Sequence, residues 1–206
     1  MRTTPIILLL FLSACSNSTP KKDENGVLKT DTESTSPYSD SIIPPSLKDT
    51  LGLDEYGKDS LKMCVAFQLA ANKLSRAYME KDVLTYSSFT PPEILKMYGG
   101  PEKYRSRVKE LLSQDHVEFD HIISGPVKRV QAAVDNDGFA HGWYCLMPVR
   151  NYIKKDGKME MQWLGGQTLD GGKTIYFLDI TGKPKEQILQ IMPDLVHFVL
   201  DQEEYQ

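Results

Sequence analysis

The spacing of the apolar residues changes once along the chain, and this change limits the folds available to it. Between Asp59 and Ser113 apolar residues recur every three or four positions, as on one face of a helix. After Gln114 they alternate with polar residues, which is the period of a half-buried strand. Helices followed by strands predict an α+β domain in which amino-terminal helices pack on one face of an antiparallel sheet.

The pattern predicts three or four helices, then four or five strands, then a short carboxy-terminal helix. Asp59 or Ser60 is expected to cap the first helix, and Thr90 with Glu93 matches a capping box. Turns rich in Asp and Gly separate the strands, so neighbouring strands should be antiparallel. The expected strands are Val117–Ile123, Val127–Val134, Gly138–Tyr152, Lys158–Gln167 and Thr174–Ile180, and the expected last helix is Lys185–Met192.

This order of elements, over residues 59–192, resembles the nuclear-transport-factor-2-like or cystatin-like superfamily. The resemblance implies a long helix lying across a curved sheet, so that the domain is cone-shaped. Enzymes of that superfamily place Asp, His or Tyr in the cone as acid or base. The stretch from Asp170 to Phe177 is also similar to phrases in small uncharacterised envelope lipoproteins, and that likeness implies no function.

The amino terminus predicts export and lipidation. Arg2 precedes the apolar run 5–12, which is too short to span a bilayer and is typical of a signal peptide. Leu12-Ser13-Ala14-Cys15 resembles the bacterial lipobox, which implies removal of residues 1–14 and acylation of Cys15. The alternative is an ordinary secretory signal. We therefore expect a lipid-anchored protein of the bacterial cell envelope, and Ser16 in place of Asp favours the outer membrane, facing the periplasm or the cell surface.

The composition of residues 15–45 predicts a disordered tether, because Ser, Thr, Pro, Asp and Lys dominate and few apolar side chains are available for burial. Residues 46–206 are expected to form one domain. Three Asp-(Ser/Thr)-aliphatic triplets resemble an envelope O-glycosylation signal, and we interpret them as linker and helix-capping residues instead. The net charge of −4 gives no basis for binding nucleic acid.

The glycine-rich residues 166–174 could form either a phosphate-binding loop or a structural hairpin. Five residues separate Gly166 from Gly172, whereas a phosphate-binding loop needs four, and a strand follows instead of a helix. The spacing of Thr168, Asp170 and Thr174 resembles the Asp-box hairpin of sialidases, in which the Asp caps a turn. A structural hairpin is the prediction, without nucleotide binding or sialidase activity.

Cys64 and Cys145 are the two cysteines left after lipidation of Cys15. We interpret them as small buried side chains, with a disulfide between them as the alternative, because a helix crossing a sheet rarely gives the required Cα separation. The sequence has neither paired cysteines nor a His-Glu-x-x-His spacing, so we expect no metal and no cofactor.

The sequence favours a non-catalytic module that binds a small apolar ligand or an envelope protein partner, in addition to the membrane through Cys15. The alternative is a small isomerase, dehydratase or hydrolase with a cone cavity. Its weak catalytic candidates are His141, Tyr144 and Asp179. The residues expected to line a cavity are Phe139, Trp143 and Met147, which share one face of the longest strand with His141 and Cys145.

Trp143 and Trp163 are expected to support the fold, because each lies in the middle of a predicted strand. The turn at residues 155–157 would bring the two indoles into one layer. A ligand-facing tryptophan is the alternative.

Overall fold

The computed structural model of the protein describes residues 42–48, 50–113, 119–134, 137, 140–154 and 157–195. The predicted signal peptide, Cys15 and most of the predicted tether lie outside these residues, and so does Phe139. Near the end of that tether the backbone carbonyl of Ile42 accepts a hydrogen bond of 2.9 Å from Asn72 Nδ2. The chain is therefore attached to the first helix already at residue 42.

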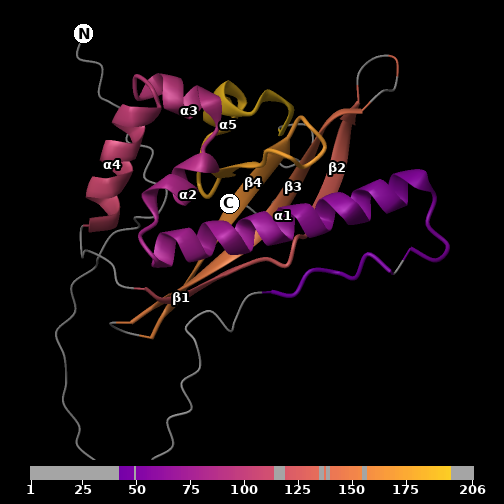
Figure 1. Cartoon of the computed structure of the whole chain (residues 1–206), viewed down its shortest axis with the longest axis horizontal. Coiled ribbons are helices and arrows are strands. Elements are labelled where there is room, and N and C mark those ends of the chain that lie inside the picture. Colours follow the sequence, from indigo (N-terminus) through magenta and orange to yellow (C-terminus); the bar gives the residue numbers. More distant parts are fainter. Residues whose placement is uncertain are drawn as a thin grey trace, which may run out of the picture.

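The predicted α+β fold is confirmed: helices come first, an antiparallel sheet follows, and a short helix ends the described chain (Figure 1). The helices are α1 (Glu55–Met79), α2 (Val83–Ser88), α3 (Pro92–Met97), α4 (Pro101–Ser113) and α5 (Lys185–Ile191), with a 3-10 helix η1 (Pro193–Leu195). The strands are β1 (Phe119–Ser124), β2 (Arg129–Val134), β3 (Ala140–Ile153), β4 (Met159–Thr168) and β5 (Tyr176–Asp179).

Helix α1 begins about one turn earlier than the apolar stripe predicts. Its cap is Asp54, whose Oδ1 accepts a 2.7 Å hydrogen bond from the Gly57 amide, and neither Asp59 nor Ser60 serves as the cap. The added turn carries Tyr56 beyond the core, where more than half of its surface stays exposed.

Strand β3 is the longest strand and organises the sheet. One edge of β3 pairs with β4, and β5 follows β4. The other edge pairs first with β1, where Ser124 lies opposite Val149, and then with β2, where Arg129 lies opposite Leu146. Strands β1 and β2 therefore form one broken edge of the sheet, interrupted at Gly125 and Pro126.

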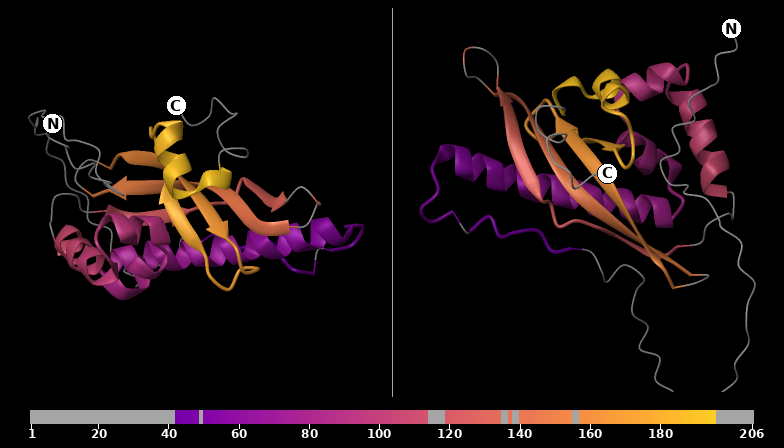
Figure 2. Two further views of the ribbon diagram at one scale, coloured as in Figure 1. Left: turned by 90° about the horizontal axis from the view of Figure 1, so that it is seen from above. Right: turned by 180° about the vertical axis from the view of Figure 1, so that it is seen from behind.

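Two adjacent glycines of β4 show that helices cover both faces of the sheet. A Cβ on Gly166 would meet Cys145 Sγ and the ring of Phe67 in α1. A Cβ on Gly165 would collide with Leu195 of η1. Because neighbouring residues of a strand point to opposite faces, α1 and α5–η1 lie on opposite sides. The left view of Figure 2 shows α1 to α4, in indigo and magenta, below the sheet and α5, in yellow, above it. We call these sides the α1 face and the α5 face.

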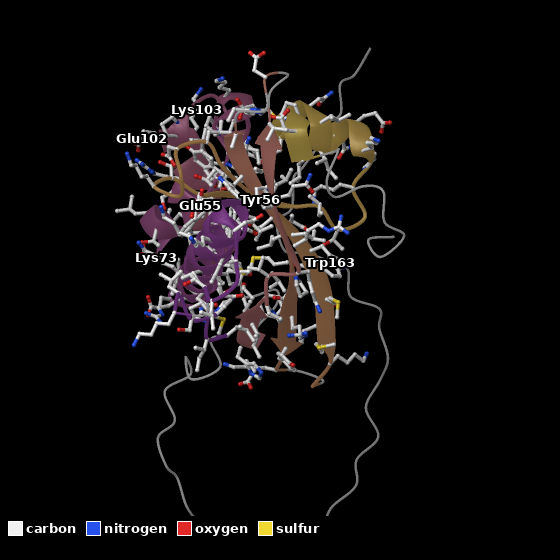
Figure 3. The ribbon with its side chains drawn as sticks, turned by 90° about the vertical axis from the view of Figure 1, so that its right-hand side faces the viewer. Glu55, Tyr56, Lys73, Glu102, Lys103 and Trp163 are labelled. Atoms are coloured by element: carbon white, nitrogen blue, oxygen red, sulfur yellow. The ribbon has the colours of Figure 1, made fainter. Side chains whose placement is uncertain are left out.

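The register separates the two tryptophans, which corrects the expectation of one indole layer. Trp143 is on the α1 face, where its ring lies 5.5 Å from that of Tyr56. Trp163 is opposite Pro148 and therefore on the α5 face. Figure 3 shows Tyr56 and Trp163 on opposite sides of the sheet. Both indoles are partly buried and pack against the core.

The turn between β4 and β5 has the structural role that its sequence predicts. Asp170 Oδ1 accepts hydrogen bonds from the Thr174 amide at 2.8 Å and from Thr168 Oγ1 at 2.9 Å. Thr168 Oγ1 in turn accepts from the Gly172 amide at 2.9 Å. The hydrogen bond from the Thr174 amide, more than any other contact, lowers the pKa of Asp170, and the carboxylate is engaged in holding the turn.

Candidate functional site

An open groove of about 370 Å³ lies where α1 passes the edge strand β2. Its α1 wall consists of Tyr56, Gly57, Ser60, Leu61 and Cys64, with Leu53 just before the helix. These positions follow helical spacing and so share one side of α1. The opposite wall is the segment Val127–Val130, which enters β2. The volume is near the lower end of the range of small-molecule sites, about 300–1,000 Å³.

Gln68 holds the second wall in place. This side chain is 1% exposed, and its Nε2 donates a 2.7 Å hydrogen bond to the carbonyl of Ser124. Its Oε1 accepts one of 3.1 Å from the amide of Val127. One buried amide thus spans the break between β1 and β2. Because Gly125 in that break has φ +100° and sits against Gln68, a side chain there would be strained and would clash.

The walls of the groove are largely apolar. Leu53 and Tyr56 keep 39% and 52% of their surface exposed, although both are large apolar side chains. Lys128 and Arg129 are exposed residues of the other wall, and the position of Arg129 opposite Leu146 turns it towards the α5 face. Burial raises the pKa of the Cys64 thiol, so this side chain stays protonated and is a poor nucleophile at neutral pH. Such a surface can bind a ligand but holds no activated nucleophile.

The predicted cavity residues do not line this groove. Met147 has no exposed surface and packs within the core cluster. Trp143 is beside the groove rather than in it, and contacts Tyr56, which does line it. Phe139 lies outside the described residues. Trp143 and Met147 lie on the face of β3 that α1 covers, where Phe67 of α1 is completely buried.

A separate polar cluster lies on the α5 face and unites two of the three catalytic candidates. Tyr144 donates a 2.8 Å hydrogen bond from its hydroxyl to Asp194 Oδ2 and accepts one of 3.0 Å from Gln167 Nε2. His141 Nε2 lies 3.6 Å from the same Asp194 oxygen. Burial, and next the Asp194 carboxylate, raise the pKa of Tyr144 to about 12. The cluster therefore joins an imidazole, a carboxylate and a protonated phenol.

A β-bulge explains why His141 is in this cluster. The pairing steps from Ala133 opposite Gly142 to Val134 opposite Ala140, so His141 has no partner position on β2. The extra residue turns the imidazole away from the face shared by Trp143 and Cys145. The expectation that His141 shares the α1 face is therefore wrong, and its side chain meets Asp194 instead.

Asp179, the third catalytic candidate, is in a different place. Its Oδ2 is 3.2 Å from Lys183 Nζ, and both side chains are mostly buried. Its Oδ1 accepts a 2.9 Å hydrogen bond from the Thr181 amide. These contacts hold the turn from β5 towards α5. The carboxylate near His141 and Tyr144 is Asp194, which the sequence did not single out.

The remaining cysteines and the acidic and histidine residues form no further centre among the described residues. Cys64 and Cys145 are free thiols. Burial raises the pKa of Cys145 well above its usual value, so this thiol is also protonated. In the same described part of the chain, no group of His, Cys, Asp and Glu side chains is arranged to hold a metal ion.

Comparisons with protein families, with curated proteins and with solved structures returned no match for this chain. The resemblance to the nuclear-transport-factor-2-like superfamily therefore stays a prediction. Within the described residues, none of the helices is both long and apolar enough to cross a membrane.

Proposed function

We propose that this protein is a lipid-anchored, non-catalytic binding module of the bacterial cell envelope that takes a small apolar ligand in the groove between α1 and β2. The groove carries this proposal. Its apolar walls come from two elements that a buried glutamine fixes relative to each other. A preformed site needs little reordering on binding, and an exposed apolar surface next to a hollow is typical of ligand sites.

The anchor rests on the sequence Leu12-Ser13-Ala14-Cys15 after a short apolar run. In the native bacterial envelope, the full chain should incorporate labelled fatty acid and partition into detergent. Cys15→Ala should abolish both signals, while Cys64→Ala should change neither. Labelling that persists in Cys15→Ala would contradict the anchor.

Binding is tested by filling the groove. Ser60→Trp places an indole between the walls, whereas Leu69→Trp adds the same indole to an exposed position of α1 outside the groove. We expect the neutral fluorescent probe N-phenyl-1-naphthylamine to bind the parent and Leu69→Trp and to bind Ser60→Trp at least about tenfold more weakly. Equal binding to all three proteins would exclude the groove as the site.

The contact between His141 and Asp194 supports a second candidate, a small hydrolase-type enzyme. A carboxylate beside an imidazole orients it as a general base, and the protonated Tyr144 hydroxyl is a hydrogen-bond donor. Hydrolysis of p-nitrophenyl esters that His141→Gln and Asp194→Asn both abolish would support this candidate. A rate that neither substitution changes would leave the binding module as the explanation.

A further inference from the structure

Exposed apolar side chains gather in the segment that leads into α1. Within this segment and the first turn of the helix, large apolar side chains are exposed at Ile43, Leu47, Leu51, Leu53 and Tyr56. In the rest of the described chain such side chains are exposed singly, except for the pair Met159 and Met161. Single exposed apolar side chains are normal on a protein surface, whereas a group of them in one short segment indicates a contact surface.

A tight turn places Leu51 at the end of this segment. The Leu53 amide donates a 3.2 Å hydrogen bond to the Thr50 carbonyl, and Gly52 has φ +82°. A glycine with positive φ at the third position is typical of a type II turn, in which Leu51 holds the second position. Turns favour Gly, Pro, Asn, Asp and Ser, yet this one carries a leucine that is 100% exposed. Packing within the domain therefore does not explain this side chain.

We propose that Leu47, Leu51 and Leu53, which we call the apolar tip, insert into the lipid surface to which the chain is anchored. This inference rests on the lipid anchor of the proposed function, because the predicted tether joins Cys15 to the described chain. Tethering gives the bilayer a high effective concentration at the domain, so a contact that would be weak in free solution is favoured. The leucines gain free energy by leaving water, as do the apolar faces of other proteins that lie on a bilayer.

The reach of the tether is sufficient for this contact. As a flexible coil, residues 15–41 span about 30 Å on average. The described chain begins at Ile42, which is bonded to Asn72 in the second half of α1. The apolar tip precedes the first residue of α1, about 27 Å away along the helix, and Figure 1 shows the segment in indigo running beside α1 to that end. A tether of this length allows the apolar tip to meet the bilayer.

The charges near the apolar tip favour a hydrophobic contact over an electrostatic one. Residues 47–58 include two basic and three acidic side chains. Lys58 pairs with Glu55 at 2.7 Å, and the Asp54 carboxylate caps α1. Because this region has no excess of positive charge, anionic lipids should not be needed for binding. A bilayer of neutral lipid is therefore the appropriate probe.

The test uses the acylated protein, purified in detergent and reconstituted into phosphatidylcholine vesicles. Leu51→Trp places an indole at the apolar tip, and Leu84→Trp places the same indole at a mostly exposed position of α2, next to the opposite end of α1 (Figure 1). Relative to the parent, we expect the emission of Leu51→Trp to shift to shorter wavelength and to be quenched by brominated phosphatidylcholine. Leu84→Trp should show neither change. Concentrated salt should preserve the difference, because the contact is not electrostatic.

Flotation of the vesicles separates this inference from the proposed function. If the parent does not float with them, the anchor fails and the inference fails with it. If all three proteins float and Leu51→Trp shows no shift, the anchor stands and the apolar tip is wrong. Equal shifts in both variants would also overturn it, because the domain would then contact lipid without a preferred side. In the full chain carrying Cys15→Ser and Leu51→Trp, a shift that grows with protein concentration in the absence of vesicles would assign the tip to a second copy instead.

Discussion

On the α1 face of the sheet Phe67, Cys145 and Met147 are completely buried, whereas on the α5 face Met159 and Met161 are 47% and 46% exposed. The long helix α1 spans the sheet, but α5 and η1 together have only ten residues and cover part of the opposite side (Figure 2). The two faces of one sheet therefore experience different environments.

This difference indicates how stability and binding are distributed. Buried apolar area is the main source of folding free energy, so the α1 face should dominate stability. The groove is at the margin of that face, where α1 extends past β2 and its apolar side chains are left uncovered. The α5 face is buried where α5 and η1 cover it, as at Leu146 and Leu195, is exposed at Met159 and Met161, and carries the polar cluster around Asp194. Substitutions on the two faces should consequently have unequal effects.

The largest difference is expected between Phe67→Ala and Met161→Ala. Phe67 has no exposed surface and packs against the ring of Phe177 at 6.4 Å. Its truncation should lower the free energy of unfolding by about 3–5 kcal/mol. Met161→Ala on the half-exposed end of the α5 face should change it by about 0.5 kcal/mol or less. Urea denaturation measures both, and similar losses would mean that the α5 face is as well packed as the α1 face.

Gly165 and Gly166 of β4 allow the two faces to be compared with the same substitution, glycine to alanine. In Gly166→Ala the new methyl would lie 2.6 Å from Cys145 Sγ and 3.1 Å from the Phe67 ring, both held in the core. Overpacking of this kind typically costs about 1–3 kcal/mol. In Gly165→Ala the new methyl meets a single side chain, the end of Leu195 on the short helix η1, instead of several core side chains. We expect the smaller loss for Gly165→Ala, and the reverse order in urea denaturation would contradict the assignment of the faces.

Alkaline pH should weaken both faces through their tyrosines. Burial raises the pKa of Tyr104 and of Tyr144 to about 12, above the value near 10 of an unfolded tyrosine. Between these values only the unfolded state loses its proton, so stability is intact below about pH 10 and falls as pH rises towards 12. Each such tyrosine costs about 1.4 kcal/mol per pH unit in this window. Urea midpoints across it should fall less steeply in Tyr144→Phe and in Tyr104→Phe than in the parent, and unchanged slopes would contradict the buried assignment.

The fold could be predicted because periodicity is a local signal. Each end of the five strands lies within two residues of the end that the sequence predicts. Apolar alternation and Asp-Gly turns make these strands visible in the sequence. Caps were less predictable because they compete with tertiary contacts. Thr90 does not cap α3 but donates a 3.0 Å hydrogen bond to the Tyr104 hydroxyl, and α3 has no side-chain cap. Thr90 therefore bonds the buried Tyr104 of α4 instead of the nearby backbone of α3.

The candidate site was harder to predict because its parts are distant in sequence. Gln68 contacts Ser124 and Val127, more than 50 residues away, and a polar residue on the apolar stripe of α1 was its only signal. Asp194 meets Tyr144 and His141 only because η1 folds back over the sheet. The bulge at His141 reverses the direction expected from strict alternation. Long-range contacts of this kind leave no spacing pattern to read.

A small effect is expected for His141→Gln. The imidazole and the Asp194 carboxylate are 3.6 Å apart, and each side chain is 44% exposed. Half-exposed ion pairs contribute about 0.2–1 kcal/mol, because water screens the charges and ordering two side chains costs entropy. We expect a loss in this range, and a smaller loss in concentrated salt.

Asp194→Asn is the matched comparison, since it removes the charge that faces His141 while an amide oxygen can still accept from the Tyr144 hydroxyl. Combined in one chain, the two substitutions should cost less than the sum of their separate effects, because either one already breaks the ion pair. If His141→Gln alone destabilised the protein as strongly as Phe67→Ala, the α5 face would contain a second centre of stability around Asp194. A negligible stability effect accompanied by loss of ester hydrolysis would instead assign the cluster to catalysis.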